Sequence, residues 1–296
     1  MKPVAFNARY EVDVAVPYRL DLTVSVLRRL STNIVDVLTP EGQYVRALGG
    51  FGEPIVVRVA QPRLGALAIT IEGATAEHSR VLAIVRRMLG IDRDLSHFDR
   101  AARGFPWLQP LAVRMRGVKP PRYPTLWEAC VNAIVFQQVS LVALRMFPSV
   151  ESFQDASDGA LRAAGLSANK LGALRRVADA LLSGVLDEAS LEEQPSPEAA
   201  ARLRRIKGIG PWTATVILLR GLGRLDVFPM NDSSVARNLA FVAGSAAVDV
   251  DRVLSALGPQ RGMLYYHLLL ARLDARGDVG RASVQSQASR AHRRES

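Results

Sequence analysis

Two carboxylates lie in one loop, about twenty residues after a pair of closely spaced glycines. The loop, GLGRLDVFPMNDSSVARNLAF, contains Asp226 and Asp232, and Asp232 directly precedes a segment of helical character. An aspartate in that position ordinarily caps the helix, and the N–H donors and dipole of the helix keep it ionised. An ionised carboxylate can also stabilise positive charge that develops on a reacting carbon. The two roles are compatible, so Asp232 is both a candidate cap and a candidate catalytic group.

The two glycines belong to a tight turn between two expected helices. Residues 197–206 and 211–221 have apolar side chains at helical spacing, and Pro211 suits the first position of the second helix. Gly208 and Gly210 permit positive φ and allow the backbone to approach a partner closely. The backbone N–H groups of such a hairpin can bind a phosphate, although a plain helix–helix corner has the same pattern. No Gly-Lys-Ser/Thr follows, so the stretch is not a nucleotide P-loop.

The composition favours a polyanionic partner. The chain has 296 residues, is 49% hydrophobic, and carries a formal net charge of +10 with a pI of about 10.4. Nucleic acid is the usual partner of so basic a protein, although ribosomal and membrane-surface proteins share this charge. Neither a long apolar stretch nor a signal peptide follows Met1, so we expect a cytoplasmic, nucleoid-associated protein with no membrane partner. Cys130 is the only cysteine, which excludes an intrachain disulfide and a four-cysteine iron–sulfur or zinc site.

The character of the sequence changes near residue 95. Before it lie segments rich in Val and Ile, with two apparent helices at about 17–30 and 76–90. We therefore predict a small α+β domain with an antiparallel sheet over residues 1–95. Its expected strands are 10–16, 33–38, 54–60 and 67–73.

The rest of the chain is predicted to be helical up to a polar tail. Residues 96–275 are punctuated by Pro and Gly, and we predict an all-α domain there. Residues 276–296 are basic and low in apolar content, so we expect them to be disordered. The expected helices are 126–137, 158–165, 169–184, 197–206, 211–221, 233–243, 249–256 and 260–274.

The segments around the hairpin are similar to those of a known family. LRRIKGIGPWTA, followed about twenty residues later by DVFPMND, resembles the helix-hairpin-helix DNA glycosylases. Within them it resembles the alkylbase group, of the 3-methyladenine DNA glycosylase II type. VFQQVS at 135–140, the run at 147–174 and YYHLLLARL at 265–273 add to the resemblance, which covers roughly 100–275. It implies an α+β segment followed by a helix-hairpin-helix glycosylase core.

The resemblance implies a reaction and its catalytic residue. The family assigns catalysis to the loop aspartate, which is Asp232 here. Lyase-type relatives carry a lysine where this chain has Trp212, so a Schiff-base nucleophile is missing and a monofunctional glycosylase is implied. It would excise 3-methyladenine- and 7-methylguanine-type bases from double-stranded DNA in base excision repair. The alternatives are a non-catalytic helix-hairpin-helix DNA-binding protein, disfavoured by Asp232, and a bifunctional glycosylase/lyase, disfavoured by the missing lysine.

The resemblance also assigns the residues around the extruded base. Trp212 would offer its flat face to that base or pack in the core of the hairpin, and the sequence leaves both roles open. Gln137 and Gln138 would enter the gap left by the flipped nucleotide. The other expected DNA contacts are Gly208, Ile209, Gly210 and Thr213, and the expected base pocket consists of Trp212, Tyr265, Tyr266, Phe136 and Trp127.

No cofactor is expected to be required, and with one cysteine no iron–sulfur cluster is expected. The backbone carbonyls of Arg204, Ile206 and Ile209 match positions that, in relatives, hold a monovalent cation bridging to a DNA phosphate. We expect the protein to act as a monomer. The chain departs from the family after Ser140, because only LVALRM separates VFQQVS from the next FP where the family has a full helix.

Overall fold

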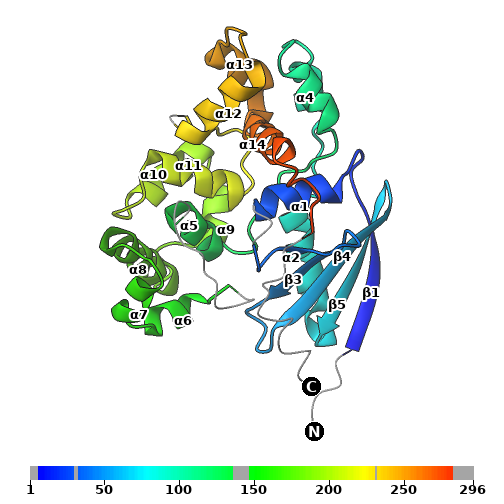
Figure 1. Cartoon of the computed structure of the whole chain (residues 1–296). Helices are drawn as coiled ribbons and strands as arrows, with labels where there is room; N and C mark the ends of the chain where they lie inside the picture. The colour runs from blue at the N-terminus through cyan, green and yellow to red at the C-terminus, as the bar shows by residue number, and fades with distance from the viewer. Residues whose placement is uncertain (1–5, 30–32, 136–146, 231, 283–296) are drawn as a thin grey trace, which may run out of the picture.

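A computed structural model describes residues 6–29, 33–135, 147–230 and 232–282 of the chain. Its N-terminal part is a five-stranded antiparallel sheet, and Figure 1 shows the described helices of the later part above and to the left of this sheet. The predicted fold class, an α+β segment followed by a mostly helical region, is confirmed. The strands lie side by side in the order β1 (Phe6–Asp13), β5 (Ala66–Gly73), β4 (Ile55–Arg63), β3 (Tyr44–Leu48) and β2 (Val37–Leu38).

The central strands alternate between a buried and a solvated face. Val57 of β4 and Ile69 of β5 are buried, whereas Arg58 and Glu72 pair with each other on the other face (Nε–Oε1 2.7 Å). This alternation is what the sequence showed in these strands. Strand β3 was not predicted, because its middle residue is a charged Arg46 that lies inside the molecule.

The helices agree with the sequence where they are long. Helix α12 has the predicted bounds, and the other predicted helices differ at their ends by a few residues, apart from the helix at 126–137, whose predicted end lies outside the described residues. Four short helices, α3, α4, α6 and α9, were not predicted, since one or two turns are too short to show a helical period. None of the helices within the described ranges is long and apolar enough to cross a membrane. The helices are α1 (Leu20–Arg28), α2 (His78–Leu89), α3 (Ser96–Ala102), α4 (Gln109–Arg114), α5 (Leu126–Val135), α6 (Val150–Asp155), α7 (Asp158–Ala163), α8 (Ala168–Leu182), α9 (Glu188–Glu193), α10 (Ser196–Arg204), α11 (Pro211–Arg220), α12 (Ser233–Ala243), α13 (Val250–Leu257) and α14 (Met263–Ala275), with short 3₁₀ turns η1 (Thr75–Glu77) and η2 (Gly258–Gln260).

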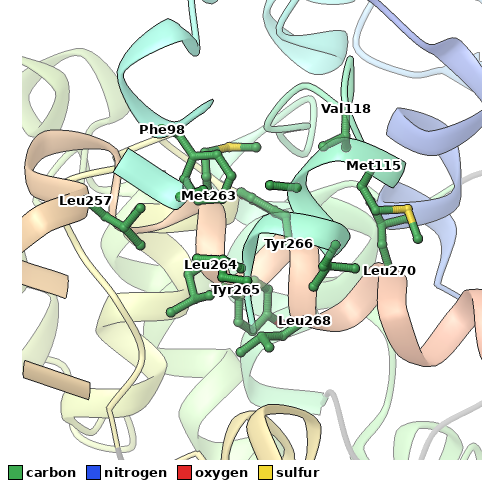
Figure 2. Packing of buried hydrophobic residues seen from close by; sticks show 14 of the residues in the cluster. Phe98, Met115, Val118, Leu257, Met263, Leu264, Tyr265, Tyr266, Leu268 and Leu270 are labelled. Carbon is green, nitrogen blue, oxygen red and sulfur yellow. The ribbon is translucent and has the colours of Figure 1, made fainter. Parts of the chain in front are cut away.

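Helix α1 packs on both the sheet and the helical region. Its Val24 and Leu27 join the hydrophobic cluster of the sheet, and its Leu22 and Val26 join the cluster built around α14. Figure 2 shows the α14 side chains interleaved with those of neighbouring elements in that cluster. A third cluster joins α5, α8, α10 and α11, which carry the hairpin. The predicted domain boundary near residue 95 stays a prediction. Helix α1 packs against residues on both sides of that boundary.

Part of the expected disordered tail is packed. The Gly280 N–H donates to Ser25 Oγ (2.9 Å), and Val279 packs against the cluster around α14. The prediction that residues 276–296 are disordered stays a prediction, and Gly280 is the residue of this segment that bonds to α1. Residues 283–296 lie outside the described part of the chain.

A buried arginine joins the sheet to the helical region. Arg46 is 2% exposed; its Nη1 donates to Asp36 Oδ1 (2.6 Å), and its Nη2 donates to Glu128 Oε2 on α5 (2.5 Å). Tyr44 Oη donates to the same Asp36 oxygen (2.8 Å). Burial raises the pKa of Glu128 although the Arg46 charge acts to lower it. The ion pairs thus fix α5, which packs against the hairpin-bearing helices, to the sheet.

Candidate active site

The hairpin between α10 and α11 depends on Gly208 for its shape. Gly208 has φ +109°, and a Cβ built there would lie 2.5 Å from Ala173 Cβ of α8. Arg176 of α8 also donates from Nε to the Lys207 carbonyl (2.7 Å), which ties the turn to α8. Gly210 differs, because its backbone is extended (φ −83°, ψ 177°) and a Cβ there would meet nothing within 4 Å. A positive φ was possible at both glycines because neither has a side chain, but only Gly208 adopts one.

The hairpin presents backbone N–H groups at the start of α11. Within the described residues, the N–H groups of Gly210, Trp212 and Thr213 have no hydrogen-bond acceptor. They lie at the positive end of a helix dipole, which favours an anion. The side chain of Ile209 is buried (4% exposed), so its predicted contact with DNA could be made only through its backbone.

Asp232 lies at the start of α12 and accepts four hydrogen bonds. Its Oδ1 accepts from the Ser234 N–H (2.7 Å), the Ser234 hydroxyl (2.6 Å) and the Val235 N–H (3.2 Å). Its Oδ2 accepts from Trp212 Nε1 on α11 (2.8 Å). The predicted capping role is therefore confirmed. The carboxylate is also joined to the first turn after the hairpin.

These contacts keep Asp232 ionised. Burial of the half-exposed carboxyl opposes ionisation, but the hydrogen bonds from the Ser234 hydroxyl, from Trp212 and from the Ser234 and Val235 N–H groups outweigh it and lower the pKa of Asp232 below its ordinary value. Asp226, the other carboxylate of the loop, is exposed and makes no side-chain hydrogen bond or ion pair within the described residues. The two loop aspartates therefore differ in their surroundings: Asp232 is partly buried and hydrogen-bonded, and Asp226 is exposed.

Trp212 donates a hydrogen bond to Asp232, whereas the other described aromatic candidates are buried and bond to other groups. Tyr265 and Tyr266 lie in the α14 cluster of Figure 2, 7% and 0% exposed; Tyr265 accepts from Arg29, and Tyr266 donates to the Leu219 carbonyl (3.1 Å). Neither tyrosine forms a hydrogen bond with Asp232. Their assignment to a base pocket stays a prediction.

Trp127 is also largely buried. It is 5% exposed, its Nε1 donates to the Pro148 carbonyl (3.0 Å), and its ring packs against Phe153 at 5.1 Å between centroids. Its base-pocket role likewise stays a prediction. Phe136, Gln137 and Gln138, together with the shortened segment after Ser140, lie outside the described residues.

The carbonyls expected to hold a cation lie on the hairpin. The Ile206 carbonyl accepts the Ile209 N–H (3.0 Å), while those of Arg204 and Ile209 accept no hydrogen bond within the described residues. The described part of the chain contains no cluster of three or more His, Cys, Asp or Glu side chains that could hold a metal ion. Cys130 is fully buried, and burial raises the pKa of its thiol to about 12.

Sequence reasoning missed Ser234. Its hydroxyl and its N–H both donate to Asp232 Oδ1, which makes it the residue with the most contacts to the carboxylate. The available signal was the Asp-x-Ser spacing at a helix start, since serine two residues after a capping aspartate can reach back to it.

Comparisons with known proteins agree with this fold. No protein-family model matches the chain. DNA-3-methyladenine glycosylase 1 of Schizosaccharomyces pombe is 33% identical over 118 residues, which are 40% of this chain and 52% of that protein. The chain spans between 38% and 61% of the length of the first curated relatives that it matches.

Two solved structures show the same fold. A 3-methyladenine DNA glycosylase from Archaeoglobus fulgidus has a TM-score of 0.72 at 22% identity, with 88% of this chain and 97% of that chain covered. The S. pombe 3-methyladenine DNA glycosylase in complex with abasic DNA has a TM-score of 0.52 at 24% identity, with 59% and 96% covered. In sequence the chain is similar to 3-methyladenine DNA glycosylases, and its fold matches that of solved structures of such glycosylases.

Proposed function

We propose that the chain is a monofunctional DNA glycosylase that hydrolyses the N-glycosidic bond of alkylated purines in double-stranded DNA, as a step of base excision repair. The observation that carries the proposal is the Asp232 carboxylate, held by hydrogen bonds from Trp212 and from the start of α12, beside a hairpin whose Gly210, Trp212 and Thr213 N–H groups have no acceptor among the described residues. The name of the S. pombe relative supports the same activity. A purely DNA-binding role would explain the hairpin but not a carboxylate fixed in this way.

The chemistry requires little besides a fixed negative charge. Alkylation at N3 or N7 gives a purine a positive charge, so the base leaves with the electron pair of the C1′–N bond and becomes neutral. The sugar then passes through an oxocarbenium-like state, which the Asp232 carboxylate stabilises. A water molecule, oriented by the same carboxylate, bonds to C1′ and releases its proton to solvent. Extrusion of the base from the duplex exposes C1′ to this group.

The hairpin supplies the phosphate contact. The N–H groups of Gly210, Trp212 and Thr213 would donate to phosphate oxygens of the backbone, which fixes the register of the DNA without reading its sequence. The carbonyls of Arg204, Ile206 and Ile209 would hold a monovalent cation, whose positive charge would favour a DNA phosphate at the hairpin. The unbonded carbonyls of Arg204 and Ile209 within the described residues fit that role. Together with the net charge of +10, these contacts predict affinity that falls with salt.

Substitution of Gly210 by valine should weaken DNA binding by roughly tenfold for every sequence alike, since a side chain would stand where the phosphate approaches. The extended backbone and the open space at Gly210 allow this change without strain in the hairpin. Fluorescence anisotropy with undamaged duplex measures the affinity. Gly49→Val is the matched control, because Gly49 is also exposed and a Cβ there would meet nothing within 4 Å. Equal DNA affinities of the two variants would show that the hairpin does not contact the DNA.

The DNA strand should remain intact after base release. Trp212 stands where lyase-type relatives among the helix-hairpin-helix DNA glycosylases carry a lysine, so no Schiff base would form at C1′. We expect methylated duplex to be cut only after alkali or a separate lyase is added, as seen on denaturing gels. Trapping of an enzyme–DNA adduct with borohydride would show a bifunctional lyase and refute the monofunctional proposal.

The proposed function is tested by incubating the chain with duplex DNA treated with dimethyl sulfate and identifying the released bases by chromatography. We expect free 3-methyladenine and 7-methylguanine above the amounts lost in buffer, with no release from untreated DNA. Tight binding to methylated DNA without any base release would favour the non-catalytic alternative.

A further inference from the structure

The two oxygens of Asp232 are not equivalent. A carboxylate oxygen has about two lone-pair sites. Oδ1 faces three donors, the Ser234 N–H, the Ser234 hydroxyl and the Val235 N–H, so it is saturated. Oδ2 accepts one hydrogen bond, from Trp212, and keeps an acceptor site. Oδ2 is therefore the oxygen available to the sugar or to the attacking water.

The donors also differ in where they come from. Ser234 and Val235 belong to α12, the helix that Asp232 itself begins, so they fix the carboxylate only relative to its own helix. Trp212 belongs to α11, twenty residues earlier, and lies two positions after Gly210 in the turn with the free N–H groups. Its ring is half-buried and packs against the cluster that joins α5, α8 and α11. The indole thus connects Oδ2 to the hairpin.

We infer that Trp212 is a positioning residue, whose indole N–H holds Oδ2 of Asp232 at a fixed place relative to the hairpin, with its remaining lone pair toward C1′ of a nucleotide whose phosphate the hairpin binds. This inference rests on the proposed function and assigns Trp212 a role different from stacking on the base. Positioning of a reacting group within about 1 Å is worth about 10²-fold in rate, so the contribution expected of this hydrogen bond is considerable.

Charged neighbouring side chains do not account for the lowered pKa of Asp232. Lys207 of the hairpin, Asp226 of the loop and Arg237 of α12 are exposed, and none forms a hydrogen bond or ion pair with Asp232. The hydrogen bond from Trp212 is one of those that lower the pKa of Asp232. Removal of the indole N–H should therefore raise the pKa of Asp232 while its α12 contacts persist.

Trp212→Phe tests the inference, because it keeps an aromatic ring and removes the donor. We expect kcat for base release to fall roughly ten- to a hundredfold with little change in KM. The acid side of the pH–rate profile should move to higher pH, because activity needs the ionised carboxylate. Carbon-13 NMR of the Asp232 carboxyl should show the same upward movement of its pKa in the free protein. Trp127→Phe is the matched control: it removes an indole N–H that donates to Pro148 instead, and should leave the Asp232 titration unchanged.

The outcomes separate the inference from the proposed function. An unchanged Asp232 titration in Trp212→Phe, with raised KM and parental kcat, would overturn positioning in favour of stacking. If the parental chain releases no base, the proposed function fails, and the NMR titration still decides whether Trp212 holds the carboxylate. Should Trp212→Phe not fold, benzothienylalanine at position 212 keeps the shape of the indole and lacks the N–H. The same rise in pKa is expected with it, and an unchanged pKa refutes the inference.

Discussion

Asp232→Asn should remain folded and lose about 10²–10³ in the rate of base release, the usual effect of removing one preorganised electrostatic group. The asparagine oxygen can still accept from the Ser234 and Val235 N–H groups and so retains most of the cap. Its amide nitrogen, however, would face Trp212 Nε1, and two donors cannot bond to each other. We expect a loss of about 0.5–1.5 kcal/mol in the free energy of unfolding, measured by urea denaturation.

The control for this variant is Asp226→Asn. Asp226 lies in the same loop but is exposed and without a side-chain partner among the described residues, so its loss should leave both the rate and the stability near the parental values. If Asp232→Asn merely unfolds earlier and releases base normally while folded, Asp232 is only a helix cap. If Asp226→Asn instead abolishes release, the catalytic assignment belongs to the other aspartate.

Arg46→Met should lower the free energy of unfolding by about 3–5 kcal/mol, the range found when one partner of a buried ion pair is removed. Arg46 stands between Asp36 and Glu128, and each of the three side chains is at most 4% exposed. Methionine fills similar space but leaves two buried carboxyls without a cation. Urea denaturation at neutral pH measures the loss.

The loss should depend on pH. Burial already raises the pKa of Glu128, and without the Arg46 charge it should rise further. A carboxyl with a raised pKa in the folded state binds its proton more tightly there than in the unfolded chain, so protonation relieves the unpaired charge. The destabilisation should be largest at high pH and decrease as the pH falls through the raised pKa. Arg58→Met, which removes a half-exposed pair with Glu72, should cost within about 1 kcal/mol; an equal loss in both variants would contradict the buried-pair account.

The parts of the site that depend on local sequence could be predicted. The cap at Asp232 follows from residues next to it, and α12 has the expected bounds Ser233–Ala243. The tight turn at Gly208 is likewise local, although only the structure shows that Ala173 of α8 forbids a side chain there.

The parts that depend on contacts between distant segments could not be predicted. The Trp212–Asp232 hydrogen bond joins residues twenty positions apart. The sequence of α14 also did not show that Tyr265 and Tyr266 would be buried. Strand β3 was missed because a buried arginine interrupts its apolar pattern, and Arg46 is tolerated there only through Asp36 and Glu128. In each case the partner in space, which the sequence does not show, decides the role of the residue.

The most direct test of the central claim is the single-turnover rate of 3-methyladenine release from dimethyl sulfate-treated duplex by the parental chain and by Asp232→Asn, each in saturating excess over the DNA. The account predicts that the parental chain releases the base far faster than buffer alone. It also predicts that the variant, at equal DNA occupancy, is slower by about 10²–10³. Equal rates for the two folded proteins, or a parental rate no higher than spontaneous loss, would contradict it.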